Sequence, residues 1–435
     1  MNRHRAEESV ETKLQLIAAR AKEEKQCKFN NLMHLLNETS LSDCYNRLKK
    51  GKASGIDRMT VEQYGQELEG RISELNGNLR KMSWKPSAVR RVYIPKANGG
   101  QRPLGIPTVE DKVVQMGITQ ILEAIYEADF LEQSYGFRKG RNAHQALKEI
   151  NRIVMNERVG WVIDADIKGF FDNVQHDWME RCLKERISDR KLIKYINRVM
   201  KGGVMEEGQF RETETGTPQG GVISPILANI YLHYVLDLWF EKRIKKRQTG
   251  YSGMVRYADD FLIFVENEAE AKEILTQLGT RLEKFGLKLS AEKTRLVRMH
   301  RKDEQSGKFD FLGFTHYLKK MGRNRYRLSR KMAKQRFAKT LETVKEWMKE
   351  NRNRYSLEQI WRKLIPKLRG YYNYYGVSDN SITLGVLADR IRQVIYYWLN
   401  RRSQRRSFTL ETFTLYLRSY PLPKPFICHV LYSYA

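Results

Sequence analysis

The chain has 435 residues, of which 41% are hydrophobic, enough for about two to four domains with substantial cores. Its 79 Lys and Arg residues outnumber its 51 Asp and Glu residues, and the net charge of +28 favours a polyanionic partner. The sequence has no hydrophobic stretch of membrane-spanning length, no signal-peptide core and no zinc-binding cysteine spacing. These features argue against a membrane protein or a zinc domain, and they predict a nucleic-acid-binding protein of the reducing cytosol.

The first part of the chain predicts helices followed by a hairpin. The first fifty residues are polar and charged with scattered apolar positions, a pattern typical of surface helices. A helix should begin after Thr60, because Gln63 completes a capping box with it. Residues 90–96 and 101–107 read as the two strands of a hairpin around a glycine-rich turn. Further helices are expected over 109–128 and 142–157.

The segment 160–167 is an apolar run interrupted by Asp164 and Asp166, and its brevity and flanking glycine favour a buried strand. The two acids share one face of that strand, because side chains alternate with a period of two. A buried strand does not tolerate unpaired carboxylates, so either a cation lies beside them or this end of the strand is solvated. The strand is therefore one candidate half of a metal site.

Downstream, a glycine-rich loop at 216–221 precedes Ser224 and Pro225. These two residues predict a helix to about residue 245, with Ser224 as its N-cap and Pro225 at the first helical position. Residues 309–314 form one more short apolar strand, and the remaining C-terminal region is expected to be helical.

A second acidic pair, Asp259 and Asp260, lies between two short apolar runs within 254–265, which predicts a β-hairpin with the acids at its turn. Carboxylate oxygens are the ligands that Mg²⁺ prefers, so the hairpin tip is a candidate second half of a metal site for phosphoryl transfer. The alternative is that the two acids are merely favoured turn residues exposed to water. The order of strand, helical insert and strand–turn–strand matches a split βαβ arrangement, which would bring Asp166 beside the hairpin.

Basic charge is concentrated near the C-terminus. Between Lys320 and Arg406 there are 23 Lys and Arg residues against 6 Asp and Glu residues, a net charge of +17. The same region is rich in Tyr and Trp. Basic side chains follow phosphates and aromatic faces stack on bases, although helices with aromatic cores and charged solvent faces give the same pattern.

Several short motifs follow one another in a fixed order within 90–315. The first two motifs are Ile-Pro-Lys at 94–96 with Arg-Pro-Leu-Gly-Ile-Pro at 102–107, and Ser-Tyr-Gly-Phe-Arg at 134–138. The next two are the segment 166–172, which begins with Asp166, and the segment 217–225, which begins with Thr-Pro-Gln-Gly-Gly. The last three are Tyr-Ala-Asp-Asp at 257–260, Gly-Leu-Lys-Leu at 286–289 with Lys293, and Phe-Leu-Gly-Phe at 311–314. Together they resemble reverse transcriptases, specifically the group II intron-encoded reverse transcriptase/maturase. The stretch 364–375 resembles the maturase signature of the thumb, which separates intron-type enzymes from retroviral ones.

The resemblance implies a catalytic triad. Asp166, Asp259 and Asp260 match the residues that bind metal in this family, and the implied cofactor is a pair of Mg²⁺ ions. Asp164 does not match the triad and is interpreted as a supporting or capping acid. Phe171 matches the bulky gate below the sugar that excludes a 2′-hydroxyl, although an apolar residue there also suits core packing.

The resemblance implies further contacts to the substrates. The matching residues are Lys96 and Arg102 for the incoming triphosphate, Gln219 for the nascent base pair, Tyr257 for the primer terminus and Lys293 for protonation of the leaving pyrophosphate. For Lys293 the residues alone fit a solvated lysine at a helix end equally well.

The implied fold is α+β: a right-hand polymerase with fingers and a split βαβ palm, followed by an α-helical thumb. The expected boundaries are a helical N-terminal extension at 1–59, fingers and palm at 60–315, a helical thumb or maturase domain at 316–406, and a short tail or rudimentary DNA-binding segment at 407–435. Only Cys428 and His429 lie near the end, so the Cys/His-rich endonuclease domain of many intron-encoded proteins is expected to be absent.

The implied function is RNA-directed DNA synthesis, in which structured template or intron RNA is copied from a DNA primer or target with deoxynucleotide triphosphates. A maturase role in the splicing and retrohoming of a group II intron is the accompanying hypothesis. Two alternatives stay open: a domesticated reverse transcriptase of DNA repair or antiphage defence, and a non-catalytic RNA-binding splicing factor. The expected partners include neither a membrane nor zinc.

Overall fold

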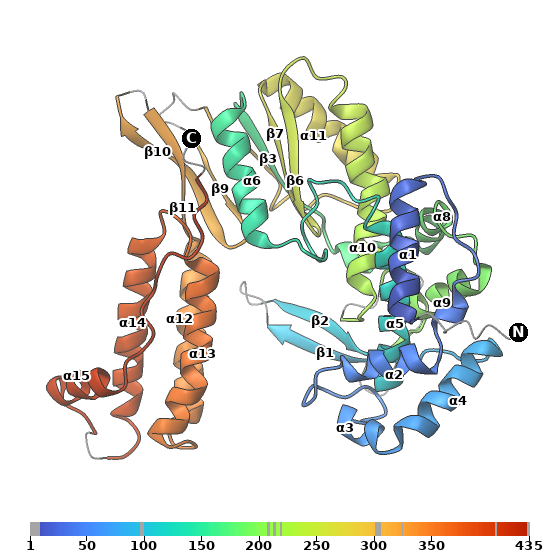
Figure 1. The fold of residues 1–435 in the computed structure, drawn as a ribbon. Coiled ribbons are helices and arrows are strands. Elements are labelled where there is room, and N and C mark those ends of the chain that lie inside the picture. Colours follow the sequence, from blue (N-terminus) through green and yellow to red (C-terminus); the bar gives the residue numbers. More distant parts are fainter. Residues whose placement is uncertain are drawn as a thin grey trace, which may run out of the picture. The chain divides into compact units, whose positions relative to one another are not determined.

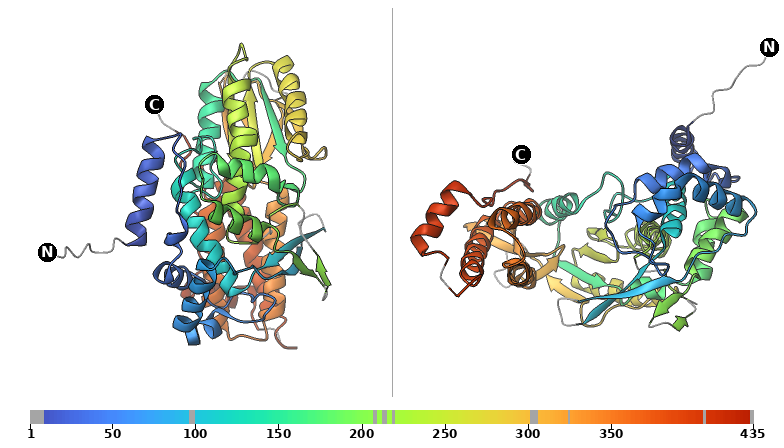
Figure 2. Two further views of the ribbon diagram at one scale, coloured as in Figure 1. Left: turned by 90° about the vertical axis from the view of Figure 1, so that its right-hand side faces the viewer. Right: turned by 90° about the horizontal axis from the view of Figure 1, so that it is seen from below.

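The structure, a computed structural model, describes residues 9–95, 100–206, 209–211, 215–217, 220–300, 306–323, 325–404 and 407–432 (Figure 1, with two further views in Figure 2). Two compact units divide the chain. They comprise Met1–Asn142, Ala165–Ile263 and Lys272–Arg295 in the first unit, and Ala143–Asp164, Phe264–Ala271 and Leu296–Ala435 in the second. Both units mix helices with strands, in agreement with the predicted α+β class.

The N-terminal region is helical, as predicted. Its elements are α1 (Val10–Glu23), η1 (Met33–Leu35), α2 (Glu38–Asn46), α3 (Val61–Tyr64), η2 (Gly65–Glu67) and α4 (Leu68–Arg80). Helices α1 and α2 pack against α5 (Val109–Tyr126), whose buried positions are mostly apolar. The predicted capping box begins α3, since the Gln63 amide donates to the Thr60 hydroxyl and the Thr60 amide donates to the Gln63 side chain.

A hairpin of β1 (Val89–Pro95) and β2 (Gln101–Ile106) follows, and its antiparallel register places Ile94 opposite Arg102. Two short strands that the sequence did not predict extend this sheet, β4 (Val204–Glu206) and β5 (Gln209–Arg211). The strand order is β2-β1-β4-β5. The hairpin is thereby tied to the segment that leads into the glycine-rich loop.

The sheet that carries the candidate acidic residues has the order β6-β7-β3-β8. Its strands are β3 (Trp161–Asp166), β6 (Ser252–Tyr257), β7 (Asp260–Val265) and β8 (Arg295–Arg298). The Gly160 amide donates to the Val265 carbonyl at 2.9 Å, so the start of β3 lies beside the end of β7. The opposite ends of these strands, Asp166 and Asp260, therefore lie at the same edge of the sheet, as the split βαβ pattern predicted.

Between β3 and β6 the chain is mainly helical. The helices are α7 (Phe170–Asn173), α8 (His176–Lys184), α9 (Arg190–Met200) and α10 (Ser224–Leu232), and α6 (Ala143–Asn156) precedes β3. The predicted N-cap of α10 was wrong, because Ile223 occupies that position and Ser224 is already helical and buried. The helix continues through two π-helical turns, η3 (His233–Asp237) and η4 (Phe240–Ile244), close to the predicted end at 245.

Helix α11 (Glu268–Glu283) follows β7. The expected strand at 309–314 is two strands, β9 (Lys308–Phe311) and β10 (Phe314–Gly322), joined by Leu312 and Gly313. Both linking residues have positive φ values, 52° and 81°, which reverse the chain in two residues. Strand β11 (Arg325–Met332) pairs with β10, so strands occupy 314–332, where helices were expected.

From residue 334 onward the predicted helices are present: α12 (Lys334–Asn351), α13 (Leu357–Tyr375), α14 (Ser381–Leu399) and α15 (Leu410–Ser419). Figures 1 and 2 show α12, α13 and α14 side by side as a bundle. Helix α13 begins with a capping box of Ser356 and Gln359. Nowhere in the described residues does a helix combine the length and the apolar character needed to cross a membrane.

Candidate active site

The end of β3 carries Asp166, whose side chain is 15% exposed. The Lys293 ammonium donates to the Asp166 carboxylate at 2.7 Å. The segment before Lys293 is held to the same strand end, because the Ser290 amide donates to the Asp166 carbonyl at 2.8 Å and Ile167 forms a β-bridge with Leu289. The chain thus brings together an acid and a lysine that lie far apart in the sequence.

The β6–β7 hairpin has a two-residue turn, Ala258 and Asp259, and Asp260 opens β7. Ala258 has a φ of +58°, a left-handed conformation that is uncommon for a residue other than glycine. Tyr257 ends β6 and is half-buried, with its ring centroid 6.5 Å from that of Phe137. The predicted hairpin, with its acids at the tip, is therefore confirmed.

The acids at this edge of the sheet interact electrostatically. Although Asp260 reaches solvent, the protein atoms around its carboxyl raise its pKa to about 7, and hydrogen bonding with Asp166 and the charges of Asp259 and Asp166 act in the same direction. For Lys293, burial alone would lower the pKa, but the hydrogen bond to Asp166 and the nearby carboxylates raise it above its ordinary value. The three carboxylates are therefore close enough to repel one another, and Lys293 offsets part of that repulsion.

These acids suit a hard cation in donor chemistry, since Mg²⁺ prefers carboxylate oxygens. Within the part of the chain that the structure describes, no three His, Cys, Asp or Glu side chains converge closely enough to hold a metal ion as they stand. The Lys293 ammonium, bound to Asp166, supplies the positive charge that a metal ion would bring. In donor chemistry Asp166, Asp259 and Asp260 fit a divalent metal ion, and Lys293 is hydrogen-bonded to one of them.

Phe171 lies in the short helix α7, five residues beyond the end of β3 at Asp166, and is half-buried. Its ring packs edge-on against the buried Phe170, with centroids 5.3 Å apart. The Phe171 carbonyl accepts a hydrogen bond from the Thr217 amide at 2.7 Å. Gly216, with a φ of +94°, leaves no room for a side chain, because an added Cβ would lie 2.8 Å from that same carbonyl. The glycine-rich loop is therefore fixed directly against the candidate gate.

The same loop also meets the hairpin of β1 and β2. An added Cβ at Gly220 would lie 2.7 Å from the carbonyl oxygen of Gly105 in β2. Arg102 lies in that strand, but its side chain is not among the described parts of the structure. The predicted site residues Lys96 and Gln219 lie outside the described residues.

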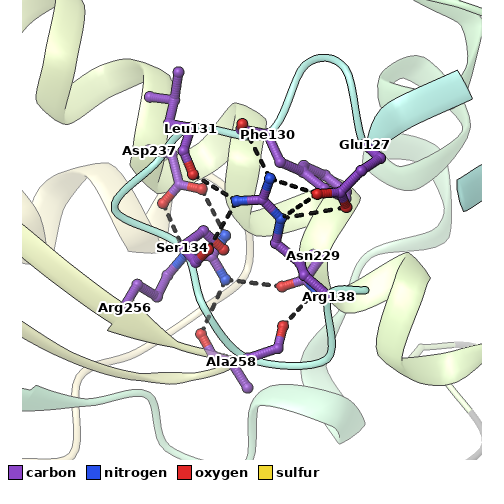
Figure 3. Close-up of polar contacts among 10 residues, drawn as sticks. Glu127, Phe130, Leu131, Ser134, Arg138, Asn229, Asp237, Arg256 and Ala258 are labelled. Carbon is purple, nitrogen blue, oxygen red and sulfur yellow. Dashed lines mark hydrogen bonds and ion pairs between the residues drawn. The ribbon is translucent and has the colours of Figure 1, made fainter. Parts of the chain in front are cut away.

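A buried polar network that was not predicted from the sequence lies beneath the hairpin turn (Figure 3). Arg256 of β6 is fully buried and binds the carboxylate of Asp237 and the side chain of Asn229, which lie on the α10–η3 helix. The sequence does contain a sign of this network, because an Arg stands inside an apolar strand and an Asp stands inside an apolar helix. Buried charges of that kind need partners.

A second buried arginine orders the segment 134–138. Arg138 donates to the Glu127 carboxylate at 2.7 Å and to the carbonyls of Leu131 and Ser134 (Figure 3). The Tyr135 amide donates to the Arg256 carbonyl at 2.9 Å. The segment therefore runs beside the end of β6, next to Tyr257.

Comparisons with known proteins show the family of the chain. The family model described as reverse transcriptase (RNA-dependent DNA polymerase) matches residues 94–316, and that of the group II intron, maturase-specific domain matches residues 337–412. The chain is 31% identical over 422 residues to the group II intron-encoded protein LtrA of Lactococcus lactis subsp. cremoris, covering 78% of this chain and 68% of LtrA. It is 32% identical over 282 residues to protein YkfC of Escherichia coli (strain K12), covering 58% of this chain and 74% of YkfC.

A yeast relative is similar over a shorter part. The putative COX1/OXI3 intron 1 protein of Saccharomyces cerevisiae is 29% identical over 314 residues, covering 61% of this chain and 37% of the yeast protein.

Proposed function

The chain belongs to the group II intron-encoded reverse transcriptase/maturase family and is an RNA-directed DNA polymerase, and from this premise we propose that Asp166, Asp259 and Asp260 are its catalytic carboxylates. The observation that carries this proposal is their meeting at one edge of the sheet, where burial of the Asp260 carboxyl, together with its hydrogen bond to Asp166 and the charges of the other two acids, raises the pKa of Asp260 to about 7. Three acids crowded in this way favour the binding of divalent cations. We assign them two Mg²⁺ ions.

When bound, such ions would lower the pKa of the primer 3′-hydroxyl and neutralise charge on the transferring phosphate. Asp259 and Asp260 would hold their side of the site from the hairpin tip, and Asp166 would hold the other side from β3. Lys293 would release Asp166 and give a proton to the leaving pyrophosphate, a role suited to an ammonium already directed at this edge. Tyr257 would lie under the primer terminus.

Deoxynucleotide selection is assigned to the residues around α7 and the glycine-rich loop. Phe171 would close the space below the sugar and exclude a 2′-hydroxyl, and its backbone contact with Thr217 supports a fixed position for the ring. Gln219 would contact the nascent base pair. Lys96 and Arg102 would hold the triphosphate, in keeping with their charge.

The domain boundaries are part of the same proposal. Residues 1–59 would form the N-terminal extension, 60–315 the fingers and palm, 316–406 the thumb, and 407–435 a tail. The helices α12 to α14 and the maturase-specific match at 337–412 support a thumb in this region. Strands β10 and β11 require its helical part to begin at 334.

The RNA partner is assigned by charge. The net charge of +17 between Lys320 and Arg406 suits the phosphates of a structured RNA, and polar groups there would contact 2′-hydroxyls. We propose that this region, with the basic N-terminal part, holds intron or template RNA during copying and splicing. Addition of the protein should then accelerate splicing of its own intron at low Mg²⁺, and failure to do so would contradict the splicing role.

Primer extension tests the polymerase assignment. Purified protein with an RNA template, a DNA primer, Mg²⁺ and deoxynucleotides should produce cDNA, and synthesis should stop when the metal is chelated. A protein that binds RNA but makes no cDNA under these conditions would instead be a splicing factor without polymerase activity.

Intron RNA around the reading frame would favour mobility, and its absence would favour a domesticated role in repair or defence.

A further inference from the structure

Arg256 is a buried charge directly beneath the turn that presents two of the candidate metal ligands. Its side chain has no exposed surface, and neither has that of Asp237. Two of its nitrogens donate to the two carboxylate oxygens of Asp237, at 2.7 and 2.5 Å. This bidentate pairing neutralises the guanidinium and fixes its plane, because both donors are engaged in parallel.

The third guanidinium nitrogen reaches the turn itself. It donates to the carbonyl oxygen of Ala258 at 3.1 Å and to the side-chain oxygen of Asn229, also at 3.1 Å (Figure 3). Ala258 is the residue with the left-handed backbone, which costs an L-residue free energy unless its surroundings hold it there. The Arg256 hydrogen bond is one such restraint, and the next two residues in the chain are Asp259 and Asp260.

The opposite side of the turn is restrained by Gly136. The side-chain amide nitrogen of Asn229 donates to the Gly136 carbonyl at 2.8 Å. An added Cβ at Gly136 would lie 2.5 Å from the Ala258 backbone nitrogen, so the two backbones are in direct contact. Asn229 thus links the guanidinium to the segment that packs on the turn.

The π-helical turn explains how one helix supplies both partners of Arg256. Asn229 and Asp237 are eight residues apart, and in a regular α-helix they would differ by about 80° around the axis. The π-turn His233–Asp237 takes more residues per turn and so reduces that difference. The irregularity directs both side chains toward the same guanidinium.

We propose that Arg256 is a positioning residue, held by Asp237 and Asn229, which fixes the Ala258–Asp259 turn and thereby places Asp259 and Asp260 for metal binding. The inference rests on the proposed metal-binding role of these two acids. A purely structural role would stabilise β6 against α10 without affecting metal affinity, and the two roles can be separated by experiment.

The decisive variant replaces both members of the ion pair, Arg256→Met with Asp237→Leu. Apolar residues of similar size in place of a buried ion pair usually keep a protein folded, whereas removing one partner leaves an unpaired buried charge. The double variant should melt near the wild-type temperature but bind Mn²⁺, measured by electron paramagnetic resonance without nucleotide, about 10- to 100-fold more weakly. Amide hydrogen exchange in 256–262 should be faster, and kcat in primer extension should fall with RNA affinity unchanged.

The matched control is the largely buried pair of Arg186 and Asp129, joined at 2.8 Å, with side chains 3% and 11% exposed, and remote in sequence from the turn. Its replacement, Arg186→Met with Asp129→Leu, should leave Mn²⁺ affinity and exchange in 256–262 unchanged. If the Arg256 double variant does not fold, Asn229→Ala should show the same changes to a smaller degree.

Wild-type Mn²⁺ affinity and wild-type exchange in a folded Arg256 variant, or in Asn229→Ala, would overturn the positioning role. Absence of cDNA from the wild-type protein would instead contradict the proposed active site, so the two failures are distinguishable.

Discussion

The ammonium of Lys293 lies 2.7 Å from the carboxylate of Asp166, an ion pair that joins residues 127 positions apart in the sequence. The partner of Lys293 is the acid that we assign to metal binding, so the lysine and the metal compete for one carboxylate. The same contact holds the ammonium at the edge of the sheet where pyrophosphate would leave. Lys293 therefore has two separable effects, one on metal affinity and one on proton transfer.

Replacing Lys293 by Ala should separate them. Loss of the general acid should lower kcat by about 10²-fold or more, whereas loss of the competing cation should lower the Mg²⁺ concentration needed for half-maximal rate. Primer extension across a Mg²⁺ series measures both. Lys288→Ala is the control, since this exposed lysine lies in the same segment; equal kcat in the Lys293 variant and the control would remove Lys293 from the mechanism.

The raised pKa of Asp260 predicts a pH dependence of synthesis. Below about pH 7 Asp260 becomes protonated and is lost as a metal ligand, so the rate should fall as the pH is lowered through 7. Because metal binding favours the ionised form, a higher Mg²⁺ concentration should move this fall to lower pH. A rate that is flat from pH 8 to pH 6 at low Mg²⁺ would contradict the assignment.

The pH dependence of folding stability that comes from Asp260 should have the opposite sign to the pH dependence of the rate of synthesis. The folded-state pKa of Asp260 lies above the ordinary value of 3.8, so its contribution to stability is present at pH values below 3.8 and is lost as the pH rises to about 7. The Tm gained by Asp260→Asn in metal-free buffer should therefore grow between pH 4 and 7 and then level off. Glu283→Gln, at an exposed position on α11, controls for the loss of one negative charge.

Asp259→Ala should abolish cDNA synthesis and leave RNA affinity within about twofold of wild type, because it removes a metal ligand and no phosphate contact. Primer extension and a filter-binding titration of template RNA measure the two quantities on one preparation. A parallel loss of RNA binding would show that the turn contributes to the RNA surface, contrary to the assignment.

Phe171→Ala should admit ribonucleotides. Removing the ring opens space below the sugar, and discrimination between dNTP and rNTP, expressed as the ratio of kcat/KM values, should fall about 10-fold or more. Incorporation of single nucleotides from both series gives that ratio. The gate assignment fails if the ratio is unchanged while the variant remains folded.

The parts of the site that could be predicted from the sequence are those that a local sequence pattern specifies. Strand period, turn residues and apolar runs placed Asp166 at the end of a strand and Asp260 at a hairpin, and strand order brought them together. Strands β10 and β11 were missed because their alternation is masked by basic residues, as in 325–332. The partners of Arg256 lie 19 and 27 residues away on an irregular helix, and no local pattern specifies that pairing.

Gly136 gives a direct test of how tightly the turn is held. An added methyl group would lie 2.5 Å from the Ala258 nitrogen and 2.9 Å from the Tyr257 carbonyl carbon, both backbone atoms that cannot rotate away. Either the segment 134–138 or the turn must shift in Gly136→Ala. Because a shift of 1 Å at reacting groups can cost on the order of 10²-fold in rate, kcat should fall at least 10-fold.

Gly77→Ala is the matched control for the same chemical change. Gly77 lies within helix α4 with no atom inside 4 Å of an added Cβ, so Ala there should raise stability by up to about 1 kcal/mol without altering kcat. Thermal melting and primer extension on both variants separate loss of fold from displacement of the turn. A Gly136→Ala protein with wild-type Tm and wild-type kcat would show that the turn tolerates displacement, and that its contact with 134–138 does not set the position of the acids.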